Sequence, residues 1–251
     1  MEKNLTADKK YTGIKILSSN ALKIIACIFM LIDHVGLVFM ADNVYMRAVG
    51  RLAFPIFAFL IVQGLMHTSD IRKYIMRMGA FALISEIPFD LAIHDRLWYP
   101  GAQNVFFTLT AGLFAIYSME SRGRLGKWRV EIALAAALIA EFLRFDYGMA
   151  GIGIILVFYW CENERRTEMS ADAGSVGVLS YFRLRQNVEA VIISTITYVL
   201  CLGMKQLYAL LALIPINMYN GKRGRWNLKY VFYVFYPAHL LIIWLIWKNV
   251  R

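Results

Sequence analysis

Apolar runs of roughly 14 to 20 residues recur along nearly the whole sequence, separated by short polar connections. A straight helix needs about 20 apolar residues to cross a bilayer, so the shorter runs indicate tilted, kinked or partly buried helices. Hydrophobic residues make up 59% of the chain and charged residues only 18%, and the mean hydropathy is +0.54. Soluble domains are rarely so apolar. The sequence therefore predicts an integral membrane protein.

The apolar runs predict an all-α fold, a polytopic membrane helical bundle of about nine transmembrane helices around a central polar cavity. We expect one membrane-embedded domain over residues 1–251, with a polar segment at 1–20 and a mobile loop at 162–187. The runs lie at residues 22–40, 51–66, 78–93, 105–117, 131–143, 148–160, 188–202, 207–219 and 230–247.

Positive charge gathers in alternate connections between these runs. If the N-terminus is cytoplasmic, the cytoplasmic stretches hold about 20 of the 27 Lys and Arg residues, including those of 1–20 and 162–187. Since Lys and Arg favour the cytoplasmic side, we predict a multi-pass protein of the cell membrane with its N-terminus inside. These loops also explain the net charge of +10. We therefore expect anionic membrane lipids as partners and no nucleic acid.

The first apolar run, LKIIACIFMLIDHVGLVF, carries Asp33 and His34 near its middle. A charged side chain at the centre of a bilayer helix costs roughly 2.5 to 3.5 kcal/mol, so these residues need partners. The second run enters the membrane from the side opposite to the first, and Arg51 at its start lies at a depth in the bilayer where it can meet Asp33. Neighbours on a helix point about 100° apart, so Asp33 is badly placed to orient His34. We predict a buried Asp33–Arg51 ion pair that leaves His34 facing a cavity.

Other costly polar residues fall at comparable depth on separate runs. Glu86 and Asp90 flank Pro88, Asn104 precedes the fourth run, and His239 lies near the middle of the last. Each alone fits a structural ion pair or an interhelical hydrogen bond. Together they indicate a functional site in the middle and outer half of the membrane. The three cysteines lack metal-ligand spacing, and we expect no metal.

Several strings, in this order and nearly this spacing, closely resemble the TraX family, named for the F-pilin acetylase. They are LKIIACIFMLIDHVGL, RAVGRLAFPIFAFLIVQGLMHTSDIRKYIMRM, SEIPFDL, NVFFTLTAGL and KYVFYVFYPAHLLIIWLI. The resemblance runs from about Leu22 to Trp247 and implies transfer of an acetyl group from acetyl-CoA to the N-terminal amine of a pilin subunit. The chain is also distantly similar to transmembrane acyltransferases whose first helix carries a functional histidine, which His34 would match.

Acetyl transfer from a thioester to an amine or hydroxyl needs a general base and donors for the developing oxyanion. His34 is the first candidate for the base, with Asp33 beside it in the candidate catalytic set. His239 is either an alternative base or a group that orients His34. Glu86 either orients an imidazole or contacts the acceptor.

The remaining polar residues of the predicted site serve the substrates. Asn104 and Arg51 are candidates to face the oxyanion, and Asp90 is placed with them as a substrate residue. The acceptor is unknown, either a pilin-like protein or a surface glycan, and acetylation of either an amine or a hydroxyl remains open.

Acetyl-CoA is a cytoplasmic anion, so its phosphates need basic residues on the inner side. The connection HTSDIRKYIMR offers Arg72, Lys73 and Arg77, and NGKRGRWNLKY offers Lys222 and Arg223. Basic residues in cytoplasmic loops can also serve only to set the orientation of the chain in the membrane, without binding a ligand.

Two other classes of function use the same residues. A proton-coupled membrane transporter would use Asp33, His34, Glu86 and His239 as a polar relay and would need no basic cradle for a cofactor. A structural or assembly factor would use them only to hold helices together. Binding of acetyl-CoA separates the acetyltransferase from both.

Overall fold

The computed structural model describes residues 15–121, 123–171, 203–225 and 228–250, together with 189, 191–193, 196 and 200. In this part of the chain the elements are helices, accompanied by two isolated β-bridges, which confirms the predicted all-α class. Three predicted segments fall wholly or mostly outside the described residues: the N-terminal stretch before residue 15, most of the apolar run at 188–202, and 172–187.

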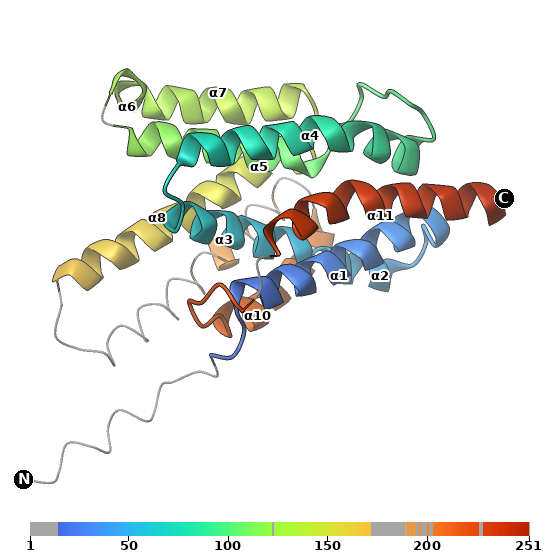
Figure 1. Ribbon diagram of the computed structural model, residues 1–251, viewed down its shortest axis with the longest axis horizontal. Coiled ribbons are helices and arrows are strands. Elements are labelled where there is room, and N and C mark those ends of the chain that lie inside the picture. Colours follow the sequence, from blue (N-terminus) through green and yellow to red (C-terminus); the bar gives the residue numbers. More distant parts are fainter. Residues whose placement is uncertain are drawn as a thin grey trace, which may run out of the picture.

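The long helices α1, α4, α7 and α11 run roughly along the longest axis of the molecule (Figure 1). Helix α11 packs on both α4 and α1, while α5 packs on α4, α7 and α8. The helices are α1 Ser19–Phe39, α2 Val44–Gly50, α3 Ala53–Met66, α4 Ile71–His94, α5 Val105–Glu120, α6 Arg124–Lys127, α7 Arg129–Phe142, α8 Gly148–Ala171, the 3₁₀ helix η1 Met204–Ala212, α10 Leu213–Asn217 and α11 Lys229–Val250.

Three helical stretches of the described chain are long and apolar enough to cross a membrane. They are Ser19–Phe39, Val44–Met66 and Tyr230–Val250, with 21, 23 and 21 residues. Helices α5 and α7 have 16 and 14 residues, fewer than the approximately 20 that a straight span needs. The three stretches support the prediction of a membrane protein, and the larger count of about nine spans stays a prediction.

The predicted loop at 162–187 begins too early, because helix α8 continues to Ala171. Glu162 forms ion pairs with Arg165 and Arg166 on the following turn. Side chains three and four residues apart are neighbours on a helix surface, so these pairs support the helix where the sequence becomes polar. The glutamate also accepts a hydrogen bond of 3.1 Å from Gln63 of α3, which ties the extension to the core.

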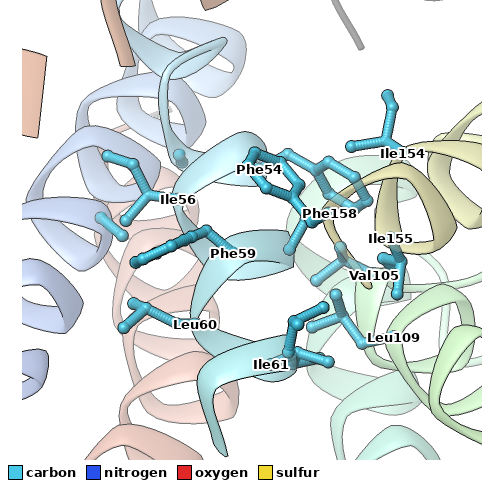
Figure 2. Close-up of a cluster of buried hydrophobic side chains, with 14 of the residues drawn as sticks. Phe54, Ile56, Phe59, Leu60, Ile61, Val105, Leu109, Ile154, Ile155 and Phe158 are labelled. Atoms are coloured by element: carbon cyan, nitrogen blue, oxygen red, sulfur yellow. The ribbon is translucent and has the colours of Figure 1, made fainter. Parts of the chain in front are cut away.

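Helix α3 is the most buried of the apolar helices and forms the centre of the packing. Phe54 and Ile61 project towards side chains of α5 and α8, whereas Ile56 and Leu60 project to the opposite side (Figure 2). Phe59 meets the ring of Phe158 on α8 edge-on, with centroids 5.9 Å apart. Large apolar side chains on every face of one helix predict burial all round, and the structure gives α3 that position.

The start of α1 is tied to the segment that precedes α11. Leu17 forms a parallel β-bridge with Tyr219, and the amides of Ser19 and Asn20 donate to the carbonyls of Lys222 and Arg223. Ser18 caps α1 by accepting a hydrogen bond from the Ala21 amide. These contacts bring the first turns of α1 and α11 to the same end of the molecule, where they frame the pocket described below.

Helices α1 and α2 approach each other closely because α2 ends in a glycine. A Cβ atom built on Gly50 would lie 2.3 Å from the Cβ of Asp33, and one on Gly36 would lie 2.7 Å from the Cβ of Met46. Real side chains do not pack so closely, so only glycine allows this contact. The absence of a side chain at Gly50 therefore lets the polar middle of α1 lie against α2.

We expect Gly50→Ala to lower the free energy of unfolding in detergent by about 1 to 3 kcal/mol, because the new methyl group forces α1 and α2 apart. Gly153→Ala is the matched control, since a Cβ at that position of α8 meets nothing within 4 Å. Alanine is the better helix former, so the control should be neutral or slightly more stable than wild type. Equal thermal midpoints for the two variants would contradict the close approach.

Candidate functional site

Two histidines from opposite ends of the sequence meet inside the bundle. The Nδ1 atom of His34 on α1 lies 2.8 Å from the Nε2 atom of His239 on α11, and the imidazoles stack with centroids 5.0 Å apart. Their exposed fractions are only 9% and 4%. The structure thus brings together the two histidines that the sequence offered as alternatives for the base.

The hydrogen bonds of this pair define which nitrogen carries each proton. The Nδ1 atom of His239 lies 2.9 Å from the carbonyl oxygen of Phe235. Since a carbonyl only accepts, Nδ1 of His239 donates, and Nε2 of the neutral ring accepts from Nδ1 of His34. The Nε2 atom of a neutral His34 is then left as a proton acceptor. His239 therefore sets the tautomer that a general base at His34 needs.

A pocket of about 670 Å³ reaches this region from the end of the molecule where α1 and α11 begin. Tyr236 belongs to its lining and meets the rings of both histidines edge-on, at centroid distances of 6.3 Å from His34 and 5.6 Å from His239. The sequence predicted that His34 faces a cavity. In the structure the histidine pair lies behind Tyr236, which lines the pocket and contacts both rings.

Basic and aromatic side chains form a large part of the wall of the pocket. Lys23, Arg77 and Arg223 supply positive charge from α1, α4 and the segment before α11. The aromatic residues of the lining are Phe57, Tyr74, Phe106, Tyr219, Phe232, Tyr233 and Tyr236. Cations held among aromatic rings can bind anionic groups and stack on planar ones. The arrangement is thus chemically suited to an anion with an aromatic part.

Arg77 is the best placed of the predicted cofactor residues. Its guanidinium lies over the ring of Tyr74, 5.7 Å from the centroid, and also interacts with Tyr233. Its Nε atom is buried without a hydrogen-bond partner among the described residues. A buried donor normally has a partner, so this atom is a candidate contact for a ligand.

The other predicted cofactor residues divide between the pocket and the surface. Both Lys222 and Arg223 are exposed, and of the two Arg223 lines the pocket. Arg72 donates a hydrogen bond of 2.8 Å to the Tyr117 hydroxyl, and Lys73 forms an exposed ion pair of 3.3 Å with Asp70. Arg72 and Lys73 are therefore engaged at the surface, away from the pocket lining.

Asp70 shows what Lys73 does at this surface. The backbone amide of Lys73 donates a hydrogen bond of 3.0 Å to Oδ1 of Asp70, which caps α4. This bond lowers the pKa of the Asp70 carboxyl below its ordinary value, with the charge of the Lys73 side chain adding to the effect. The pair thus stabilises the first turn of α4 and supports its start beside the pocket.

The ion pair of Asp33 is with Arg47, which corrects the predicted pairing with Arg51. The Nη1 atom of Arg47 lies 2.8 Å from Oδ1 of Asp33. The sequence pointed to Arg51 because it treated residues 51–66 as one helix facing α1. The structure places the separate short helix α2 against α1, and this helix carries Arg47 on its side facing Asp33.

Arg51 contacts a different group of polar residues near the start of α8. It hydrogen-bonds to Tyr147 and interacts electrostatically with Asp33 and Asp146. The carbonyl oxygen of Asp146 accepts a hydrogen bond from Thr108 of α5. Arg51 therefore interacts with α1 and with the turn between α7 and α8, so its guanidinium already has protein partners.

Glu86 and Asn104 form a buried unit that holds α5 against α4. The side-chain amide of Asn104 donates to Oε2 of Glu86 at 2.5 Å and to the Ala82 carbonyl at 2.8 Å. Its oxygen accepts the Phe106 amide at 3.0 Å and caps α5. Both amide hydrogens of Asn104 are thus bonded within the protein, so its predicted oxyanion role would require one of these bonds to be exchanged.

Asp90 lies one turn beyond Glu86 on α4 and is fully buried. Its Oδ2 atom accepts a hydrogen bond of 2.7 Å from the Tyr99 amide, which fixes the connection between α4 and α5. Its Oδ1 atom has no hydrogen-bond partner among the described residues. The residue therefore has one oxygen in a structural bond and one available, and its predicted substrate role stays a prediction.

Three residues of this region were not singled out in the sequence. Lys23 and Arg47 entered the sequence analysis only within the total of 27 Lys and Arg residues, and Tyr236 only as part of a matching string. The string FYPAHL was the available signal for Tyr236, since it lies three residues before His239 and shares its helix face. No comparable signal marks Lys23 as a pocket residue, because its neighbours there come from distant segments.

Comparisons with known proteins agree with the resemblance. The family described as "TraX protein" matches residues 18–247. The chain is 31% identical over 238 residues to "Probable fimbrial assembly protein FimC, serogroup H1" of Dichelobacter nodosus, covering 90% of this chain and 94% of that protein. It is 25% identical over 226 residues to "Protein TraX" of Escherichia coli, covering 88% of this chain and 84% of the relative. No solved structure matches the chain.

The Asp33–Arg47 pair can be tested by a double-mutant cycle on unfolding in detergent. We expect Asp33→Asn and Arg47→Gln each to destabilise the protein, and the double variant to lose less than their sum, with a coupling energy of about 1 to 3 kcal/mol. The matched cycle of Asp33→Asn with Arg51→Gln should show a smaller coupling, because Arg51 has Tyr147 and Asp146 as further partners. A larger coupling to Arg51 would restore the predicted pairing.

Proposed function

Because this chain belongs to the TraX family, we propose that it is a membrane-embedded acetyltransferase. It moves an acetyl group from cytoplasmic acetyl-CoA to an amine or hydroxyl of a translocated or cell-surface acceptor. The observation that carries the proposal is the pocket that joins Lys23, Arg77 and Arg223 to Tyr236, the residue in contact with both histidines. A basic end for phosphates and a buried base near the other end are what an acyl-CoA enzyme requires.

The donor would lie in the pocket with its charged part towards the basic residues. Charge-assisted bonds from Arg77 and Arg223 suit the phosphates, and the neighbouring aromatic rings suit the adenine. Lys23 and Met30 both line the pocket and are separated along α1 by roughly 10 Å. An extended pantetheine arm can cover that distance, which would bring the thioester near Tyr236.

His34 is the proposed general base. Its Nε2 atom accepts the proton of the acceptor amine or hydroxyl while the acceptor nitrogen or oxygen attacks the thioester carbonyl carbon. The carbon–sulfur bond then breaks, and the proton passes to the CoA sulfur. His239 keeps His34 in the required tautomer through the hydrogen bond to Nδ1. Burial of the pair keeps water from competing with the acceptor.

The proposed setting is a multi-pass protein of the cell membrane with a cytoplasmic N-terminus and about nine spans around a polar centre. The basic residues of the pocket mouth then face the side where acetyl-CoA is found, and membrane lipids surround the apolar helix faces. One relative is named as a fimbrial assembly protein, and the TraX family is named for a pilin acetylase. We therefore propose a pilin-like protein as the acceptor, with a surface glycan as the alternative.

Purified protein in detergent should bind labelled acetyl-CoA and slowly transfer or hydrolyse the label. His34→Ala should lower this activity by about 10² to 10⁴-fold, because a general base is lost. The thermal midpoint should also fall, because the variant leaves Nε2 of the buried His239 without its partner, so activity is compared at equal amounts of folded protein. Retention of more than about a tenth of the activity would move the base to His239.

The same experiment separates the acetyltransferase from the rival classes. A proton-coupled transporter that uses Asp33, His34, Glu86 and His239 would move its substrate and protons in vesicles without binding acetyl-CoA. An assembly factor would tolerate His34→Gln as long as the protein folds. Failure of the folded wild type to bind acetyl-CoA would reject the proposed function.

Residues at the mouth of the pocket should affect donor affinity more than turnover. Arg77→Gln with Arg223→Gln should raise KM for acetyl-CoA about tenfold or more and largely spare kcat, because phosphate contacts are equal in ground and transition states. The matched control is Arg72→Gln with Lys73→Gln, whose side chains are engaged elsewhere. An acetyl-pantetheine donor without nucleotide phosphates should show no such difference. Equal losses with both donors would assign the basic residues to folding or topology.

A further inference from the structure

Tyr236 occupies the place where the pocket meets the histidine pair. Its exposed fraction is 2%, it lines the pocket, and its ring meets His34 and His239 edge-on. The ring also packs edge-on against Phe106 of α5, with centroids 5.0 Å apart. Packing against these three rings fixes the position of the Tyr236 side chain. A side chain that donates a hydrogen bond during catalysis must be held in place in this way.

The hydroxyl of Tyr236 lies at the start of α5. The backbone amide of Val105, the first residue of that helix, interacts with this oxygen and favours negative charge there. Val105 and Tyr236 both line the pocket, so the hydroxyl hydrogen can be donated to an acceptor bound there. The positive end of the helix also favours negative charge near this hydroxyl.

Other candidates for the oxyanion donor are engaged in the structure. Asn104 gives its side-chain hydrogens to Glu86 and Ala82. Arg51 interacts with Tyr147 and Asp146. Neither residue belongs to the lining of the pocket, whereas Tyr236 does.

We propose that the Tyr236 hydroxyl is the oxyanion donor, hydrogen-bonding to the carbonyl oxygen of an acyl thioester in the pocket. This inference rests on the acetyltransferase function proposed above. As the acceptor forms its bond to the carbonyl carbon, the carbonyl electron pair moves to oxygen and the Tyr236 hydroxyl stabilises it without giving up its proton. The pair returns when the carbon–sulfur bond breaks. His34 takes the acceptor's proton and delivers it to the CoA sulfur.

The test compares two tyrosines on the same face of α11. Tyr236→Phe removes only the hydroxyl and should lower kcat about 10² to 10³-fold, with little change in KM for acetyl-CoA. Tyr233→Phe is the matched control, since Tyr233 also lines the pocket but interacts with Arg77 instead of the histidines. It should keep kcat and change only KM. Both variants retain the ring and should keep the thermal midpoint of the wild type.

A spectroscopic measurement separates a donor to the carbonyl from a structural role. The measurement is made with the His34→Ala variant, which does not consume the bound acetyl-CoA. When Tyr236→Phe is added to this variant, the infrared carbonyl stretch of isotope-labelled acetyl-CoA should move to higher frequency, because the carbonyl oxygen loses its hydrogen bond. Tyr233→Phe should leave it unchanged. If Tyr236→Phe does not fold, fluorotyrosine at position 236 is the replacement, and its more acidic hydroxyl should lower the frequency.

The outcomes distinguish this inference from the function on which it rests. An active wild type whose Tyr236→Phe variant keeps both kcat and the carbonyl frequency would overturn the oxyanion role alone. A folded wild type that neither binds acetyl-CoA nor transfers the acetyl group would overturn the acetyltransferase function and the oxyanion role with it. Loss of kcat together with the frequency change supports both.

Discussion

The hydrogen bond between His34 and His239 joins the first long helix of the chain to the last. Both histidines lie in stretches apolar enough to cross a membrane, where an unpaired polar group is costly, so each provides a partner for the other. Because Nδ1 of His239 donates to the Phe235 carbonyl, Nε2 of His239 accepts from Nδ1 of His34. Nε2 of His34 is then the nitrogen that can accept a proton. The chemistry of the candidate site depends on this pairing.

Charge is separated along the molecule in a way that suits a large anionic donor. Lys23, Arg77 and Arg223 line the pocket near the helix ends, whereas Asp33 and Arg47 neutralise each other deeper along α1 and α2. The opposite charges of an ion pair largely cancel, whereas several cations that line one pocket produce a positive potential that attracts an anion. The pocket would thus select its ligand by charge at the mouth and by shape and hydrogen bonding at depth.

Several polar residues hold the helices so that the site can form. Glu86 and Asn104 attach the start of α5 to α4, which positions the Val105 amide beside Tyr236. Gly50 lets α2 approach α1 and so places Arg47 against Asp33. These residues support the proposed chemistry through position, which is how buried polar networks specify one arrangement among many.

The sequence by itself determined the membrane class, the all-α fold and the basic character of one set of loops, and it offered His34 and His239 as candidates, because hydropathy and charge are local properties. The sequence analysis ended α8 too early, because hydropathy does not reveal the ion pairs of Glu162 that support the polar end of this helix. It also paired Asp33 with Arg51, because hydropathy does not reveal that α2 is a separate helix from α3. Only the tertiary structure decided that Tyr236 stands between pocket and histidines. Contacts among α1, α5 and α11 join residues far apart in sequence, and the packing that selects them has no local signature.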